Sequence, residues 1–267
     1  MNPTIMNVRD LLEHVHEAQV EPGCQASPPW FKDQANLWFR GHALEKWLLQ
    51  PQVLRDGFAV RARNLNPHAP DPVFSFEASL FNQFRRRGHH LLPVSNVLTK
   101  TYFLAQHHGL PTRLLDWSIN PLVSLFFAVT EHADHNGSVI VMRARHEIPG
   151  QEERDIMYEE DPAVGTIVKS LFDREFSPEQ MAGLPLRIMP DVQSGRMLHQ
   201  DSRFTLHQPG CQNLDEVVSQ GFIRKLEVPS KAKCKIREEL RFLGVHWGTL
   251  FPDLPNLVKQ IRHEAHA

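Results

Sequence analysis

The chain has 267 residues, 41% hydrophobic and 22% charged, which is typical of a globular protein with one large or two small domains. The net charge of −2 excludes a general nucleic-acid coat protein but allows a local basic face. No stretch approaches the roughly 18 consecutive apolar residues of a membrane span, and the first residues lack the pattern of a secretion signal. The scattered cysteines, Cys24, Cys211 and Cys234, fit a reducing cytoplasm.

Apolar spacing predicts the first elements of the chain. Residues 6–19 read as an amphipathic helix, with Leu12 among the residues of its apolar face. The bulky run at residues 37–39 predicts a short strand that ends at residues 40–41. Three prolines in the polar stretch 61–73 predict a surface loop.

A helical pattern begins near Phe74. Glu77 lies in its first turn and three arginines, residues 85–87, lie in its last, which suits the helix dipole. Gly88 follows and predicts a left-handed stop. A second helix is expected over residues 96–108.

The middle of the chain predicts strands on both sides of an apolar helix. Gly109 ends the preceding helix, and residues 113–117 read as a buried strand. Asn120 is expected to cap the apolar helix over residues 121–129, whose first residue is proline. Residues 139–142 predict the next strand.

The last third of the chain is less regular. Residues 145–185 are charged and resemble a lid or insertion. Strands are expected at residues 203–206 and 222–226, and two helices from Ser230 on, separated by a turn at residues 247–252. The whole pattern predicts one α+β domain with helical decoration.

The run from Gln106 to Ser118, QHHGLPTRLLDWS, is the most informative stretch. It collects amide, imidazole, guanidinium, carboxylate, indole and hydroxyl groups directly before the apolar helix. A buried polar group without a partner costs about 1–3 kcal/mol. The many polar groups in this run therefore predict one wall of a binding site. The alternative is a polar network that pins a loop.

Sixteen histidines raise the question of a metal site. His132 and His135 stand three residues apart, but no acidic ligand accompanies them at helical spacing. We therefore expect no bound metal.

Several blocks together resemble the FRG domain family, which is named for a Phe-Arg-Gly signature. These blocks are residues 38–42, 47–51, 106–129, 196–206 and 244–254, together with Glu77. The resemblance implies an FRG domain over residues 35–260, after an N-terminal helix and loop at 1–34 and before a tail at 261–267. The chain departs from the family at residues 200–204, QDSRF, where a Gln-x-Gly-x-Phe pattern is usual.

The order of the blocks is similar to the three-motif plan of ADP-ribosyltransferases, which implies an ADP-ribosyltransferase-like mixed sheet core and NAD as substrate. On that plan the catalytic residues are Arg40, Ser118 and Gln200. The NAD-binding residues it implies are Arg40, Gly41, Gln106, His107, Thr112, Arg113, Asp116, Trp117 and Phe204.

Cleaving the bond between nicotinamide and ribose passes through an oxocarbenium-like transition state, which a nearby carboxylate favours. Gln200 adds no charge, so Glu77, Asp116 or Asp201 would have to supply it. Strand alternation places Gln200 and Asp201 on opposite faces. Alternatively, Arg40 only forms a structural ion pair with Glu77 or Asp116.

The resemblance implies a cytoplasmic toxin of a bacterial toxin–antitoxin or anti-phage system, restrained by an antitoxin. As acceptor we expect RNA ahead of protein or DNA, because basic residues between Arg224 and Arg237 suit a phosphate backbone. Trp30 or Trp38, if exposed, would stack on an unpaired base. The alternatives are a metal-free ribonuclease using His107 or His108 with Arg40, and a non-catalytic ligand-sensing module.

Overall fold

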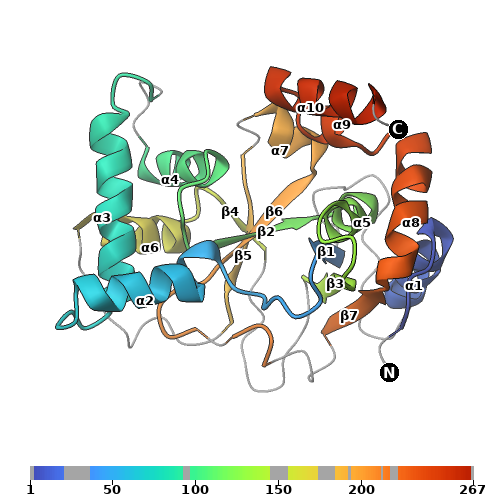
Figure 1. Cartoon of the computed structure of the whole chain (residues 1–267). Helices are drawn as coiled ribbons and strands as arrows, with labels where there is room; N and C mark the ends of the chain where they lie inside the picture. The colour runs from blue at the N-terminus through green and yellow to red at the C-terminus, as the bar shows by residue number, and fades with distance from the viewer. Residues whose placement is uncertain are drawn as a thin grey trace.

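One mixed sheet organises the protein (Figure 1). The computed structural model describes residues 3–20, 37–92, 97–144, 156–173, 184–191, 194–211, 213–216 and 222–265. Its described strands are ordered β4-β5-β6-β2-β1-β3-β7. Among these described strands, β4 and β5 pair in parallel and all other neighbours are antiparallel.

The strands are β1 (Leu37–His42), β2 (Leu114–Ser118), β3 (Gly137–Arg143), β4 (Met157–Tyr158), β5 (Leu186–Met189), β6 (Ser202–Leu206) and β7 (Ile223–Val228). The helices are α1 (Val8–Val20), η2 (Gln52–Leu54), α2 (Asp56–Leu65), α3 (Pro72–Arg87), α4 (Leu98–His107), α5 (Pro121–Thr130), α6 (Pro162–Asp173), α7 (Gly195–His199), α8 (Ser230–Phe242), α9 (Trp247–Leu250) and α10 (Leu254–Ala265). This arrangement confirms a mixed sheet with helical decoration.

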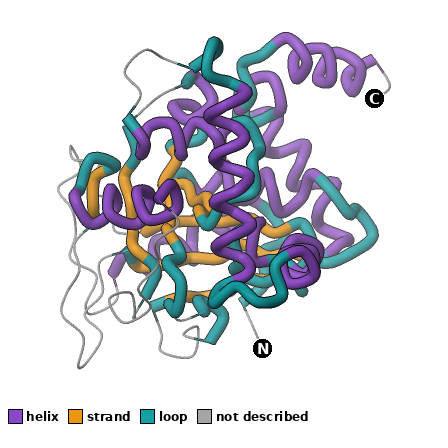
Figure 2. The backbone as a smooth tube through the Cα atoms, turned by 90° about the vertical axis from the view of Figure 1, so that its left-hand side faces the viewer, coloured by secondary structure: helices purple, strands orange, loops and turns teal. Residues whose placement is uncertain are grey.

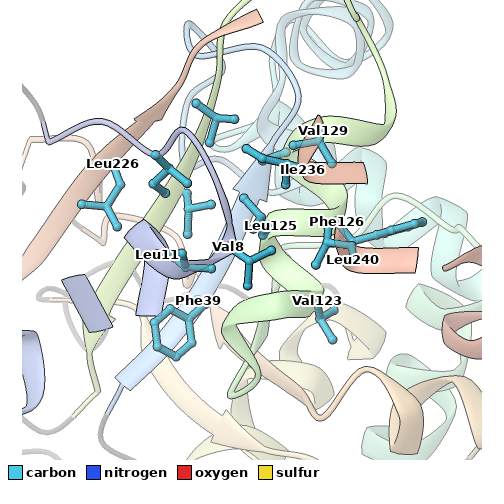
Figure 3. Packing of buried hydrophobic residues seen from close by; sticks show 14 of the residues in the cluster. Val8, Leu11, Phe39, Val123, Leu125, Phe126, Val129, Leu226, Ile236 and Leu240 are labelled. Atoms are coloured by element: carbon cyan, nitrogen blue, oxygen red, sulfur yellow. The ribbon is translucent and has the colours of Figure 1, made fainter. Parts of the chain in front are cut away.

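The sheet has two halves with different helical covers, as Figure 1 shows, with α1, α5 and α8 on one side and α3, α4 and α6 on the other. On β1, β3 and β7, alternate residues such as Phe39 and Val141 face a core built with α1, α5 and α8. Figure 3 shows Val8 and Leu11 of α1 packed near Leu125 of α5 in this core. The side view in Figure 2 shows α10 at the periphery, beside the C-terminus.

The second core belongs to β2, β5 and β6 and to helices α3, α4 and α6. A third cluster fills the opposite face of β1 and β3, where Trp38, fully buried, packs with Trp117 of β2. Strand β3, which is buried along its whole length, is thus covered on both faces. The two halves of the sheet meet at β1 and β2.

Local signals explain the best-predicted elements. The Asn120 side chain accepts a hydrogen bond from the Leu122 amide at 3.0 Å, and Pro121 opens α5 as expected. Gly109, with φ of 84°, ends the turn after α4. Those predictions are confirmed.

Four predictions in the first half of the chain are wrong in detail. Residues 61–73 are not one loop, because α2 runs to Leu65 and α3 begins at Pro72, where the Asp71 side chain caps it. Leu12 is 48% exposed, because the buried face of α1 lies one residue to its side. Gly88 stops α3 with φ of −86°, not in the left-handed region. Strand β1 does not end at residues 40–41, because its pairing with β3 continues to His42.

Three further predictions in the second half are also corrected. The region 145–185 contains α6, whose apolar face lies in the second core. The expected turn at residues 247–252 holds the short helix α9. Residues 195–199 form α7, so Gln200 precedes β6 as the last cap residue of a helix.

Candidate functional site

A cavity opens where the two halves of the sheet meet. Strands β1 and β2 pair at Phe39 and Ser118, and Arg40 and Trp117 come next along them. A cavity of about 260 Å³ lies beside this junction, with α5 on one side and residues of α7 and α9 on another. Figure 1 shows how α5, α7 and α9 gather around the β1–β2 region.

Arg40 bridges the two strands next to the point where they pair. Its Nε donates to His42 Nε2 at 3.0 Å, and its Nη1 donates to the Asp116 carbonyl oxygen at 2.5 Å. The same nitrogen lies 3.9 Å from the Asp116 carboxylate. Of the two partners weighed for Arg40, Glu77 and Asp116, the structure therefore selects Asp116.

Burial lowers the pKa of Arg40 to about 10, with Asp116 opposing the shift and Arg55 adding to it. The guanidinium remains charged at neutral pH. Burial, followed by the charges of Arg40, Arg55 and Lys225, lowers the pKa of His42 to about 2. His42 is therefore a neutral ring that accepts a hydrogen bond from Arg40.

Two more arginines reach the same cavity. Arg55 follows η2, and burial lowers its pKa while Asp116 opposes that change. Arg196 of α7 lies over the Phe251 ring, with its guanidinium carbon 4.6 Å from the ring centre. With Asp116 and Glu131 as the cavity's carboxylates, three guanidinium groups leave a net positive charge, which favours an anionic ligand.

The structure gathers six of the predicted site residues around this cavity: Arg40, Gly41, Asp116, Trp117, Ser118 and Gln200. Five others, all in the described part of the chain, are not among the lining residues: Gln106, His107, Thr112, Arg113 and Phe204. Sequence reasoning missed Arg55 and gave no role to Arg196. A helical reading of residues 196–200 would have placed Arg196 one turn before Gln200.

Gln106 and Thr112 form a chain of hydrogen bonds that leads to the Asp116 carboxylate. The Gln106 amide nitrogen lies 3.3 and 3.2 Å from the two Asp116 carboxylate oxygens. The Thr112 hydroxyl donates to the Gln106 carbonyl oxygen at 2.5 Å. These bonds fix the direction of the Asp116 carboxylate. Burial, with the charges of Arg196 and His108, lowers the pKa of the nearby His107.

Arg113 belongs to a buried network instead. Its Nε lies 2.7 Å from a Glu77 oxygen, and Nη1 donates to the His207 carbonyl oxygen at 3.2 Å. Glu77 also accepts from the Arg113 amide at 2.9 Å and from the Tyr102 hydroxyl. Glu77 is fully buried in this network, so its carboxylate does not face the cavity. Phe204 packs against Phe103 in the second core, with ring centres 5.2 Å apart.

Ser118 and Gln200 tie neighbouring elements together at the cavity wall. The Ser118 hydroxyl donates to the Gln200 carbonyl oxygen at 2.7 Å and accepts from the Asn120 amide at 2.9 Å. The Gln200 side-chain nitrogen donates to the Leu250 carbonyl oxygen at 3.1 Å. The expected strand alternation of Gln200 and Asp201 is wrong, because Asp201 adopts a left-handed φ of 47° between α7 and β6.

Gly41 serves the packing of α5 against β1. A Cβ atom at this position would lie 1.9 Å from the Ser124 carbonyl oxygen and 2.8 Å from the Ala128 nitrogen. The glycine of the Arg40-Gly41 pair is thus required by helix–strand contact. Trp117 is 3% exposed and its indole nitrogen donates to the Thr205 hydroxyl at 3.0 Å.

Two expectations about an RNA surface fail in part. Trp38 is fully buried and offers no stacking face, and Trp30 lies outside the described residues. Lys233, within the expected basic segment, is 1% exposed and donates to the carbonyl oxygens of Ala43 and Glu131. The basic segment is therefore not one continuous exposed face.

A comparison with protein families identifies part of the chain. Residues 35–137 match the FRG domain. This FRG segment contains β1, α2 to α5 and β2, and therefore Arg40, Arg55 and Asp116. No curated protein and no solved structure matches the chain.

None of the described helices combines the length and apolar character needed to cross a membrane. No group of three or more histidine, cysteine, aspartate or glutamate side chains in the described ranges could hold a metal ion.

Proposed function

We propose that this protein is an NAD-dependent ADP-ribosyltransferase that modifies a macromolecule. The observation that carries the proposal is the convergence of Arg40, Arg55 and Arg196 on one cavity beside Asp116. A pyrophosphate suits several guanidinium groups at once, because each guanidinium offers paired planar donors that match phosphate oxygens. NAD carries such a pyrophosphate between its two nucleosides.

The size and walls of the cavity suit part of a dinucleotide. Its volume of about 260 Å³ is below the roughly 300–1,000 Å³ of pockets that enclose a whole ligand. It would hold the pyrophosphate and one nucleoside. Trp47, 38% exposed, lines the cavity and offers an aromatic surface for a nicotinamide or adenine ring.

Cleavage of the bond between nicotinamide and ribose needs no strong general acid, because nicotinamide leaves as a neutral base. What accelerates it is negative charge close to the ribose as positive charge develops there. Asp116, oriented by Gln106, is the carboxylate best placed for this electrostatic role. Gln200 would bind a ribose hydroxyl and Ser118 would hold the Gln200 backbone in position.

The arrangement of the three motifs supports an ADP-ribosyltransferase-like core. The motif strands β6, β2 and β1 are consecutive neighbours in the sheet. From the family resemblance we propose further that the protein is a cytoplasmic toxin of a toxin–antitoxin or anti-phage system, with a cognate antitoxin and with RNA as the favoured acceptor. The alternative of a metal-free ribonuclease has less support, because neither His107 nor His108, its candidate acid–base groups, is among the residues that line the cavity.

A thermal-shift titration with NAD, ADP-ribose and nicotinamide tests the proposal. Ligand at about 100 times its dissociation constant stabilises the folded state by about 2.7 kcal/mol. We expect NAD and ADP-ribose to raise the melting temperature, and Arg196→Gln to weaken that effect while Arg86→Gln on α3 does not. The proposal fails if none of the three ligands shifts folded wild-type protein. Shortening of RNA without NAD would favour the ribonuclease instead.

A further inference from the structure

A second cavity lies against the wall of the first. Its volume is about 220 Å³, and it shares Thr130, Glu131 and Trp247 with the first cavity. The C-terminal end of α5 and the start of α9 therefore separate two spaces. Groups held beside these shared residues in the two cavities would be neighbours.

The side chains of the second cavity suit one nucleotide of a nucleic acid. Arg237 and Arg241 stand one helical turn apart on α8, so they lie on the same face. Within the described part of the chain neither has an ion-pair partner, which leaves both available for phosphate. Trp247 lines this cavity and offers a ring on which a base would stack, and the buried Phe126 contacts it edge-on, with ring centres 5.2 Å apart.

Glu131 is the carboxylate between the two spaces. It is the cap residue at the end of α5, is exposed, and lines both cavities. The Asp116 carboxylate is held by Gln106 and lies near Arg40. The Glu131 carboxylate, by contrast, makes no hydrogen bond or ion pair to another described residue. It is therefore free to accept a proton.

We propose that the second cavity binds a nucleotide unit of a single-stranded RNA acceptor, and that Glu131 is the general base of the transfer. This inference rests on the proposed NAD activity. An acceptor hydroxyl oxygen bonds to the ribose C1′ of NAD while the C1′–N bond to nicotinamide breaks. The bonding electron pair stays on the nicotinamide nitrogen and removes its positive charge. The hydroxyl proton passes to the Glu131 carboxylate and then to water.

RNA binding is the first test, because it requires no NAD. The probe is a fluorescent oligouridylate, followed by anisotropy in full-length protein over a range of salt concentrations. We expect the double variant Arg237→Gln/Arg241→Gln to bind about 10-fold more weakly or worse. The slope of log Kd against log salt should fall by about 1.4, because each lost phosphate contact on a single strand contributes about 0.7.

The matched control is Arg86→Gln/Arg87→Gln, which removes two exposed arginines from the end of α3. It should bind the probe as the wild type does. Equal binding by the Arg237/Arg241 double variant, or an equal loss in both double variants, would overturn the assignment of the second cavity.

Transfer of label from adenylate-labelled NAD to oligouridylate is the second test. Glu131→Gln should keep the NAD-dependent thermal shift and bind the probe normally, yet transfer label about 100-fold more slowly or worse, as expected for loss of a general base. Wild-type rates in this variant would overturn the role of Glu131. Label on protein and none on RNA would overturn the acceptor class. Failure of NAD to bind wild-type protein would instead remove the proposed function, and the anisotropy result would still decide the RNA site.

Discussion

Replacing Gly41 with alanine should destabilise the protein strongly, although alanine is only one methyl group larger. The added Cβ would lie 1.9 Å from the Ser124 carbonyl oxygen, whereas ordinary contact begins at 3.4 Å. The obstruction is backbone, so rotating a side chain cannot relieve it. Helix α5 would have to move away from β1 by more than 1 Å.

Moving α5 would cost free energy of folding, because the helix is packed against other elements on several sides. Its Val123, Leu125 and Val129 are at most 1% exposed and pack in the core with α1 and α8. Extra atoms in a packed core cost about 1–3 kcal/mol, and a contact with rigid backbone belongs at or above the upper end. We therefore expect Gly41→Ala to lower the free energy of unfolding by about 3 kcal/mol.

Urea denaturation followed by circular dichroism measures this quantity. The matched control is Gly165→Ala in α6, where a new Cβ meets no atom within 4 Å. There alanine should stabilise the helix by about 0.5–1 kcal/mol. If Gly41→Ala unfolds at the same urea concentration as the wild type, close packing is not the reason for glycine at this position.

Three further predictions concern the buried charges and rings. Glu77→Gln should destabilise by about 3–5 kcal/mol in urea denaturation, because it leaves the Arg113 guanidinium buried without its counter-charge; a loss below about 1 kcal/mol would contradict this. Burial lowers the pKa of His42 to about 2 and that of His207 to about 3, so the folded protein keeps both rings neutral while the unfolded chain takes up protons below about pH 6.5. Stability should thus fall by about 1.4 kcal/mol for each ring from pH 7.5 to 5.5, and His42→Gln should remove about half of that fall. Arg40→Lys should keep the fold and lose the NAD-dependent thermal shift, because an ammonium group cannot reproduce the guanidinium fork; an undiminished shift would make Arg40 purely structural.

The elements that sequence predicted best are those fixed by local chemistry. Helix α5 follows from a cap, a proline and an apolar run, which act within a few residues of one another. Strands β1 and β2 are short apolar runs, and Arg40, Asp116 and Ser118 reach the cavity because these strands meet there.

The parts that sequence missed depend on contacts between distant residues. Helix α7 is one short turn, GRMLH, and the assumption that the strand already includes residues 200 and 201 placed Gln200 on β6. Arg55 and Arg196 lie far apart in the chain and meet only because the folded sheet brings them to one cavity. Arg113 stands within the motif beside Asp116, and only the buried position of Glu77 shows that it points elsewhere.

The FRG segment alone should not fold, although it contains much of the cavity. Within residues 35–137, β1 and β2 pair at Phe39 and Ser118, whereas their extended pairings are with β3 and β6, which lie almost wholly outside. Each of the three apolar clusters also draws members from beyond residue 137. A fragment of residues 35–137 would expose two unpaired strand edges and apolar side chains whose packing partners are missing. We expect its circular dichroism to show no cooperative urea transition, whereas the full chain under the same conditions shows one. A cooperative transition in the fragment would mean that the segment is an independent unit, and that Arg196 and Gln200 are additions to a site already complete without them.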